Sequence, residues 1–380
     1  MNQLATHTFP DANTTIADKA ALVLILVKML LVVPLGVVIS SLVLYMTHQL
    51  NLPDSTALGV MASFIGCTGN MRVIAGYLGD RIVNHCQLLL LCTFFLTLGC
   101  LIMTVRAYFY YGLTSIAVGA GLSIAVDCLL TDIFQNDDIA REAAFLRNYS
   151  GMNMGYIVSF ALSGYFELHH QNNSLFMIAS VFSVFAMGII IANWAILSSH
   201  KRSNVMIGLP AVLIVLFFLH VLIKTAAVNN IFIFIFSIIL TFWILRFAIK
   251  QPTNEHKNKI ISYLILAIPV LIFWTLYNLS PMALTIFIER KVNRHYFGYE
   301  IAPQWAQLVL TAAVVIGGPL LYYLFNNLRK RGIKINHSYQ FSLGIILIGL
   351  SLLILPLGLY FSNPDERLNK VLQMKIWIKK

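Results

Sequence analysis

The sequence predicts an all-α, polytopic membrane protein with about eleven transmembrane helices. Of its 380 residues, 59% are hydrophobic and only 11% are charged, and the mean hydropathy is +0.80. A soluble domain carries about 25% charged residues, so this chain has too few to cover its surface in water. Its apolar runs are long and continuous rather than alternating, which predicts membrane-spanning helices instead of the strands of a barrel.

Apolar stretches of about 20 residues, the length of a helical span, recur along the whole chain. We expect spans near 20–46, 56–79, 87–105, 110–133, 147–166, 174–198, 206–223, 230–249, 259–286, 304–326 and 339–361. The linkers are short, so we expect one bundle within the lipid bilayer and no soluble domain. Spans seven and eight are almost purely apolar, and a hairpin that faces lipid suits them better than the wall of a polar pathway.

The positions of lysine and arginine place the N-terminus in the cytoplasm, because most basic loops then fall on the cytoplasmic side. These loops carry Arg81, Arg141, Arg147, Lys201, Arg202, Arg246, Lys250, Lys257, Lys259, Arg329, Lys330, Arg331 and Lys334. Arg290, Lys291 and Arg294 fall outside and disagree with this orientation, as does the basic C-terminal tail. Loop bias also explains the net charge of +11, so we expect no nucleic-acid partner.

The sequence contains no recognisable site for covalent or metal chemistry. Its five cysteines lie in or beside apolar runs without C-x-x-C spacing, which is typical of small packing residues; a disulfide or a metal site is the alternative. Neither an H-E-x-x-H nor a G-x-S-x-G motif is present, and the adjacent His169 and His170 are poor joint metal ligands. We therefore expect no enzyme activity, no catalytic residue, no metal and no cofactor.

A charged turn follows the second predicted span and reads G-Y-L-G-D-R from Gly76 to Arg81. Gly76 would allow close helix approach near the membrane surface, and Asp80 would hold basic groups or a helix N-terminus across the cytoplasmic face. Gly76, Asp80 and Arg81 resemble the GxxxDR loop motif of the major facilitator superfamily. An ordinary charged turn is the alternative, and Cys86 and Gln87 stand where the superfamily has basic residues.

The fifth predicted span reads Y-S-G-M-N-M-G from Tyr149 to Gly155. Tyr149 and Asn153 are four residues apart, so they share a helix face, and an asparagine in apolar surroundings needs partners. The stretch resembles the YxxxNxGS motif of the proton-dependent oligopeptide transporter family, with Tyr156 in place of the serine. That family uses the asparagine to bind the peptide backbone; an interhelical hydrogen bond is the alternative.

The ninth predicted span is the strongest match to the same family. It reads F-W-T-L-Y-N-L-S-P from Phe273 to Pro281 and is similar to the family's FWxLYxQxP segment. Matching residues follow at Leu284, Phe287, Arg290, Val292, Asn293, Gly298 and Gly317-Gly318-Pro319. On these motifs the chain is identified as a member of this family. The resemblance implies a major facilitator superfamily-type helix bundle in the inner membrane, with substrate-binding residues Tyr149, Asn153, Tyr277 and Asn278.

The resemblance also implies a function: a secondary active transporter that imports di- or tripeptides, or similar small solutes, together with protons. Pro281 removes one backbone hydrogen bond and should kink the ninth helix, and such bending suits alternating access. A static kink is the alternative.

The chain departs from the family in the residues that couple protons to peptide. At the Glu, Glu and Arg positions of the ExxER motif it has Lys28, Leu31 and Val32. Lys28, Arg72 and Asp127 are the ionisable residues left inside predicted spans, where isolated charges are costly. Members of the family pair a glutamate on the first helix with a lysine on the fourth. We expect Lys28 and Asp127, on the same two helices, to form a pair with these charges exchanged, and Arg72 is a competing partner. Snorkelling of Lys28 toward the cytoplasm is the alternative.

These matches predict five segments in the chain. They are a polar cytoplasmic N-terminus (1–19), a six-helix bundle (20–200), an inserted two-helix hairpin (201–257), an incomplete C-terminal bundle of three helices (258–362) and a polar basic tail (363–380). These five segments include no counterpart of the last three helices of the family's core. A transport-inactive remnant or membrane scaffold is therefore the alternative function.

Overall fold

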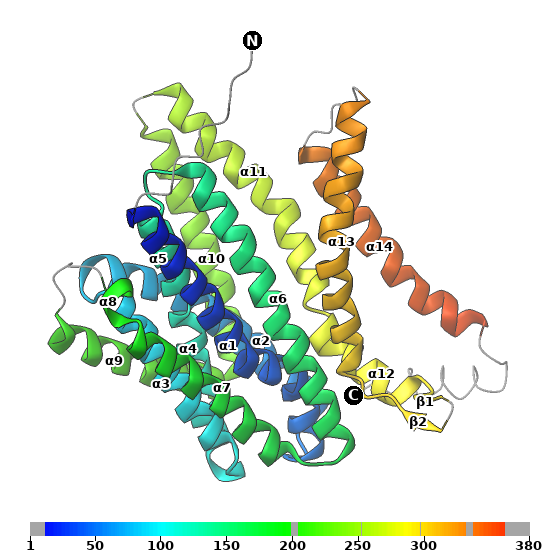
Figure 1. Ribbon diagram of the computed structural model, residues 1–380. Coiled ribbons are helices and arrows are strands. Elements are labelled where there is room, and N and C mark those ends of the chain that lie inside the picture. Colours follow the sequence, from blue (N-terminus) through cyan, green and yellow to red (C-terminus); the bar gives the residue numbers. More distant parts are fainter. Residues whose placement is uncertain (1–11, 199–203, 252, 297, 332–336, 362–380) are drawn as a thin grey trace. The chain divides into compact units, whose positions relative to one another are not determined.

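The computed structural model describes residues 12–198, 204–251, 253–296, 298–331 and 337–361 (Figure 1). The predicted tail 363–380 and most of the predicted N-terminus lie outside these residues. The chain divides into two compact units: Met1–Ile239 with Pro281–Pro319, and Leu240–Ser280 with Leu320–Lys380. The five predicted segments stay a prediction.

Long helices build the first unit, as expected of a chain that must satisfy its backbone hydrogen bonds internally. They are α1 (Ala12–His48), α2 (Asp54–Arg81), α3 (His85–Met103), α4 (Phe109–Leu122), α5 (Ile124–Ile133), α6 (Asp138–Leu168), α7 (Asn172–Ala192) and α9 (Val205–Lys224), with the short η1 (Arg106–Tyr108), α8 (Trp194–Leu197) and α12 (Thr285–Lys291). Two strands, β1 (His295–Tyr296) and β2 (Tyr299–Glu300), form an antiparallel hairpin in which Tyr296 lies opposite Tyr299.

The second unit contains α11 (Asn254–Tyr277) and α14 (His337–Phe361), which pack against each other. Two further helices, α10 (Ala226–Ile249) and α13 (Trp305–Lys330), have residues in both units. The π-helical turn η2 (Ser280–Leu284) joins α11 to α12.

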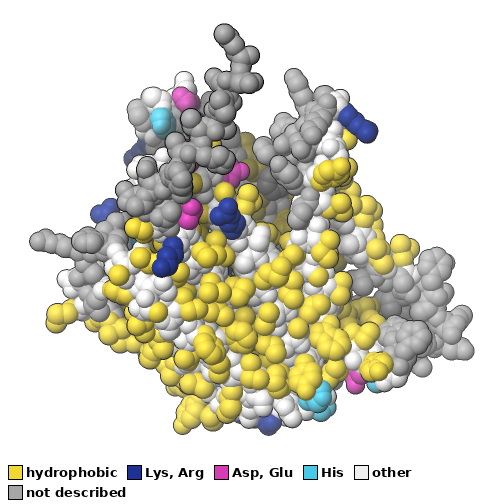
Figure 2. Space-filling model, in the orientation of Figure 1, with side chains coloured by type: hydrophobic (Ala, Val, Ile, Leu, Met, Phe, Trp, Pro, Cys, Tyr) yellow, Lys and Arg dark blue, Asp and Glu magenta, His cyan; other side chains and the backbone are white. Residues whose placement is uncertain are grey.

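The structure confirms the predicted all-α membrane fold. Within the described residues, eight helical segments are long and apolar enough to cross a membrane. The other three predicted spans coincide with α6, α13 and α14. In α13 and α14 the structure describes shorter apolar segments, Trp305–Gly318 and Ser342–Ile354. Figure 2 shows apolar side chains over most of the lower half of the face in view, with charged side chains mainly above this area and along its lower edge.

The core of the first unit lies between α1, α3, α4, α6 and α7, with α2 packed against α4. Tyr45 is fully buried there, with its ring stacked on Phe109 at 5.7 Å and edge-on to Phe176 at 5.4 Å. None of the five cysteines is in a disulfide; Cys128 is half-buried and the other four are buried, as expected of packing residues.

Glycines let α1 and α6 touch. A Cβ added to Gly155 would overlap the backbone carbonyl oxygen of Met29, and one added to Gly36 would overlap the hydroxyl of Ser159. Because a backbone carbonyl cannot rotate away as a side chain can, Gly155 sets the closest approach of these two helices.

Substitution of Gly155 by alanine is expected to push α1 from α6 and to lower the free energy of unfolding by about 1–3 kcal/mol, the usual cost of overpacking. Gly188 on α7 is a matched control, since no atom lies within 4 Å of an added Cβ there. Alanine at Gly188 should raise helix stability by up to about 1 kcal/mol. Thermal unfolding of both variants in detergent measures the difference, and equal effects would contradict the close contact.

Polar groups link the start of α10 to α2 within the first unit. The amide of Asn229 donates to Cys67 Sγ at 3.3 Å, and the hydroxyl of Ser63 lies 3.2 Å from both the Ala226 carbonyl and Asn230 Oδ1. Beyond these contacts α10 exposes large apolar side chains, among them Phe232, Phe234, Ile235, Phe236, Ile239 and Phe242. This exposed apolar surface of α10 suits lipid, as predicted, whereas the polar contacts between α10 and α2 were not predicted.

Candidate functional site

A cavity of about 350 Å³ opens in the first unit between α1, α2, α5 and α6. Its polar lining consists of Lys28, Arg72, Ser123, Asp127, Asn148, Tyr149 and Tyr156, and its apolar lining of Val32, Leu35, Ile124, Phe145 and Met152. The volume falls within the range of about 300–1,000 Å³ that is usual for small-molecule sites.

The cavity contains a buried ion pair. Lys28 Nζ lies 3.2 Å from Asp127 Oδ2, so the structure brings together the two residues expected to pair. The Lys28 side chain is 10% exposed and that of Asp127 is 27% exposed, which leaves the lysine charge dependent on its partner. Lys28 points to Asp127 instead of snorkelling, and Arg72 forms no ion pair with a described residue.

A second partner of Asp127, Asn148, was missed by the sequence analysis. Its amide donates a hydrogen bond of 2.8 Å to Asp127 Oδ1, so each oxygen of the carboxylate accepts one hydrogen bond. Asn148 immediately precedes Tyr149 of the recognised motif, and this adjacency to the motif was the available signal.

A break in the predicted fourth span positions Asp127. The helix is divided at Ser123 into α4 and α5, and the Ser123 hydroxyl donates to the carbonyl of Ala120 at 2.7 Å. Asp127 thereby lies in the first turn of α5.

The four predicted substrate-binding residues fall into two groups. Tyr149 lines the cavity and is exposed, whereas Asn153 is buried and its amide donates to the Tyr149 carbonyl at 2.8 Å. Tyr277 and Asn278 belong to the second unit, so their place beside the cavity stays a prediction.

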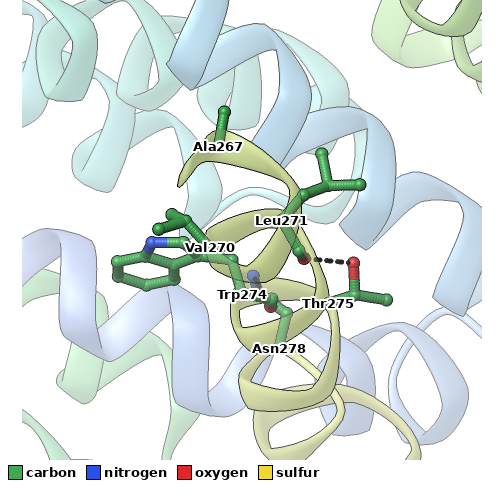
Figure 3. Close-up of a pocket in the computed structure, with 6 residues that line it drawn as sticks. All are labelled: Ala267, Val270, Leu271, Trp274, Thr275 and Asn278. Carbon is green, nitrogen blue, oxygen red and sulfur yellow. Dashed lines mark hydrogen bonds between the residues drawn. The ribbon is translucent and has the colours of Figure 1, made fainter. Parts of the chain in front are cut away.

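A shallow depression on α11 surrounds Asn278 (Figure 3). Its lining residues come from α11 and from Asn278, which caps the C-terminus of that helix. The polar groups drawn there bond to the helix's own backbone: Asn278 Nδ2 donates to the Trp274 carbonyl and Thr275 Oγ1 to the Leu271 carbonyl, both at 2.8 Å. Both hydrogen bonds therefore stay within this helix and its cap.

The motif from Gly76 to Arg81 forms the last turns of α2 instead of a loop, and its close contact differs from the one expected. No atom lies within 4 Å of a Cβ added to Gly76, whereas one added to Gly79 would overlap the imidazole of His85. Close approach within this unit therefore occurs at Gly79. Asp80 Oδ1 lies 3.4 Å from His85 Nε2 at the start of α3, and Arg81 is the last residue of α2.

Pro281 lies at a change of helix type. It falls in the π-helical turn η2, between the end of α11 and the start of α12. A turn of this kind relaxes the backbone around the hydrogen bond that proline cannot make. The regular helix is therefore interrupted at the residue for which the sequence predicted a kink.

A charged cluster that the sequence did not reveal lies where α1 ends and α2 begins, at the other end of α2 from Gly79. We call it the His48 cluster, after the last residue of α1. His48 Nδ1 lies 3.4 Å from Glu167 on α6, and its Nε2 contacts Glu289 on α12. Arg290 Nη1 and Nη2 donate to the carboxylate of Asp54 on α2 at 2.6 and 2.8 Å. Asp54 thus neutralises one of the arginines that disagreed with the predicted orientation.

Comparison with known proteins gives the family. Residues 82–378 match the family described as PTR2, the POT family. Dipeptide and tripeptide permease A of Chromobacterium violaceum is 24% identical over 344 residues, 85% of this chain and 67% of the relative. The protein of the same name in Escherichia coli K12 is 24% identical over 339 residues, 84% of this chain and 66% of the relative. The chain thus spans about two thirds of the length of these relatives.

Solved structures share the fold. A crystal structure of "peptide transporter POT in complex with sulfate" superposes with a TM-score of 0.78 at 18% identity, covering 93% of this chain and 80% of the other. A structure of "a POT family transporter in complex with 5-aminolevulinic acid" gives 0.78 at 17% identity, covering 90% and 77%. The family is one of transporters and not of enzymes. With most of its length matched by the family and its helices arranged as in these structures, the chain belongs to the POT family of multi-pass membrane transporters.

Proposed function

We propose that the chain imports di- or tripeptides, or small solutes of similar size, across the inner membrane. The observation that carries the proposal is the cavity of about 350 Å³ in the first unit, with its paired charges and two tyrosines. A cavity of this kind combines apolar walls with a few polar groups that orient a small ligand. The relatives named dipeptide and tripeptide permease support this substrate class.

Proton coupling is assigned to the ion pair. A proton on Asp127 would cancel its charge and weaken its bond to Lys28 Nζ, 3.2 Å away. Proton binding and separation of α1 from α5 are then linked, since each helix carries one partner. Lys28 and Asp127 thereby take the coupling role that the ExxER residues have in the family.

The cytoplasmic N-terminus is part of the proposal. Lysine and arginine are concentrated in the loops that this orientation places in the cytoplasm, and Asp54 neutralises the outer Arg290. To test this orientation, one cysteine at a time is introduced, next to Arg81 or next to Thr47, and its reaction with a thiol reagent that cannot cross the membrane is measured from outside. Only the cysteine next to Thr47 should react.

Uptake of labelled alanyl-alanine into proteoliposomes tests transport. We expect uptake above protein-free liposomes, greater when the outside is more acidic, and lost on addition of a protonophore. Asp127→Asn protein should not respond to the pH difference. Folded and inserted protein without any uptake would contradict the proposal and support the alternative, a transport-inactive membrane scaffold.

A further inference from the structure

The helices α4 and α9 meet where their two spans reach the same side of the membrane. The span that contains α4 begins at Arg106, and the span of α9 ends at Lys224. The imidazole of His220 on α9 is stacked on the ring of Tyr111 on α4, with the ring centroids 4.2 Å apart and the ring planes at 13°. His220 Nδ1 also lies 3.3 Å from the hydroxyl of Thr114, so this histidine has both an aromatic and a polar partner on α4.

The two basic residues at this place have no counter-charge among the described residues. Lys224 and Arg106 are exposed and form no ion pair with any of them, and Arg106 donates a hydrogen bond to the neutral side chain of Gln49. The acidic residues around the nearby end of α1 are paired with other groups: Asp54 with Arg290, and Glu167 and Glu289 with His48. Two unneutralised positive charges at the ends of membrane spans attract an anion from outside the protein.

One face of α9 changes from apolar to cationic along its length, which indicates the kind of anion. Leu213, Phe217, His220 and Lys224 follow one another at intervals of three or four residues, so they share this face. Leu213 and Phe217 are exposed on it, and the exposed ring of Tyr111 lies beside it. A phospholipid has the same order, from its apolar acyl chain through the ester region to its phosphate. Aromatic and basic side chains are enriched at this level of a bilayer.

We propose that the junction of α4 and α9 binds a phospholipid. Lys224 binds the phosphate, the stacked rings of Tyr111 and His220 lie beside the ester region, and an acyl chain lies along Phe217 and Leu213. A soluble anion would use only the basic residue, whereas the exposed apolar face next to it suits a molecule with an acyl chain. Phosphatidylglycerol should bind more tightly than phosphatidylcholine, because the choline ammonium neutralises the phosphate charge. None of these five residues lines the cavity of the first unit, so the lipid site is separate from it.

Native mass spectrometry of the detergent-purified protein, titrated with phosphatidylglycerol, tests the site. Lys224→Gln should weaken the tightest binding of this lipid by about fivefold, the effect of one basic residue beside an anionic headgroup, and Lys224→Arg should retain it. Lys259→Gln is the matched control, because Lys259 is also exposed but its charge is already paired with Glu255. Equal binding of phosphatidylglycerol by Lys224→Gln and by the unmodified protein would overturn the proposal.

Two further measurements separate a lipid from a soluble anion. Glycerol 1-phosphate carries a phosphate without acyl chains, so at equal concentration it should not displace phosphatidylglycerol. Phe217→Gln should weaken lipid binding, because the acyl chain loses an apolar contact, whereas Phe185→Gln on α7 should not; the two phenylalanines are 71% and 63% exposed. Displacement by glycerol 1-phosphate, or unchanged lipid binding in Phe217→Gln, would show that the junction binds a soluble anion and would overturn the proposal.

Discussion

Replacement of Asp127 by asparagine is expected to abolish proton-driven uptake and to lower the free energy of unfolding by about 3 kcal/mol, the low end for a broken buried ion pair. The low end applies because the Asp127 side chain is 27% exposed to the cavity. The loss arises because the Lys28 ammonium stays buried while its partner no longer carries a charge. Uptake under an imposed pH gradient and thermal unfolding measure the two effects.

A double-mutant cycle isolates the pair. Lys28→Met alone should be as damaging as Asp127→Asn, whereas the double variant should regain much of the stability because neither charge remains. We expect a coupling free energy above about 1.5 kcal/mol. Asp138 and Arg141 are the matched control: they form an ion pair on α6, but the Asp138 side chain is 85% exposed, so their coupling should stay below about 0.5 kcal/mol. Additive effects of the Lys28 and Asp127 substitutions would reject the pair.

Substitution of His48 by leucine is expected to destabilise the protein by about 2 kcal/mol, because two largely buried carboxylates lose the imidazole between them. The side chains of Glu167 and Glu289 are 13% and 15% exposed. Hydrogen exchange of the α12 amides should rise, since His48 links α1 to this helix. Thermal unfolding and exchange followed by mass spectrometry give both quantities.

The control for His48 lies at the end of α6. His169 is exposed and its Nδ1 lies 2.7 Å from the carbonyl of Tyr165 in its own helix, so His169→Leu should change stability by less than about 0.5 kcal/mol. Removing the two glutamate charges as well, with Glu167→Gln and Glu289→Gln, should offset part of the His48→Leu loss. An equal loss in His48→Leu and His169→Leu would show that the His48 cluster does not connect the helices.

The helices and the ion pair could be predicted from the sequence, because each follows from a local pattern of residues or from the resemblance to the family. A run of about 20 apolar residues has few structural alternatives in a chain this hydrophobic. Lys28 and Asp127 stood out because charges inside such runs are rare. The expected pairing followed from the need to compensate two buried charges.

The features that were missed depend on tertiary contact. Asn148 on α6 donates to Asp127 on α5, a partner that its place beside the motif does not identify, whereas the motif asparagine Asn153 bonds to its own helix. The close approach assigned to Gly76 occurs at Gly79, because His85 at the start of α3 lies against that glycine. The glutamates that bind His48 come from helices far apart in the chain, so sequence proximity could not connect them.

The burial of the native thiols makes the chain suitable for site-directed reporters. Thiol reagents in water react with accessible thiolates, and four of the five cysteines are buried within the helices. A cysteine placed at Tyr149, which is exposed and lines the cavity, would therefore react ahead of these four. Its rate of modification from each side of the membrane would report directly on when the cavity opens to that side.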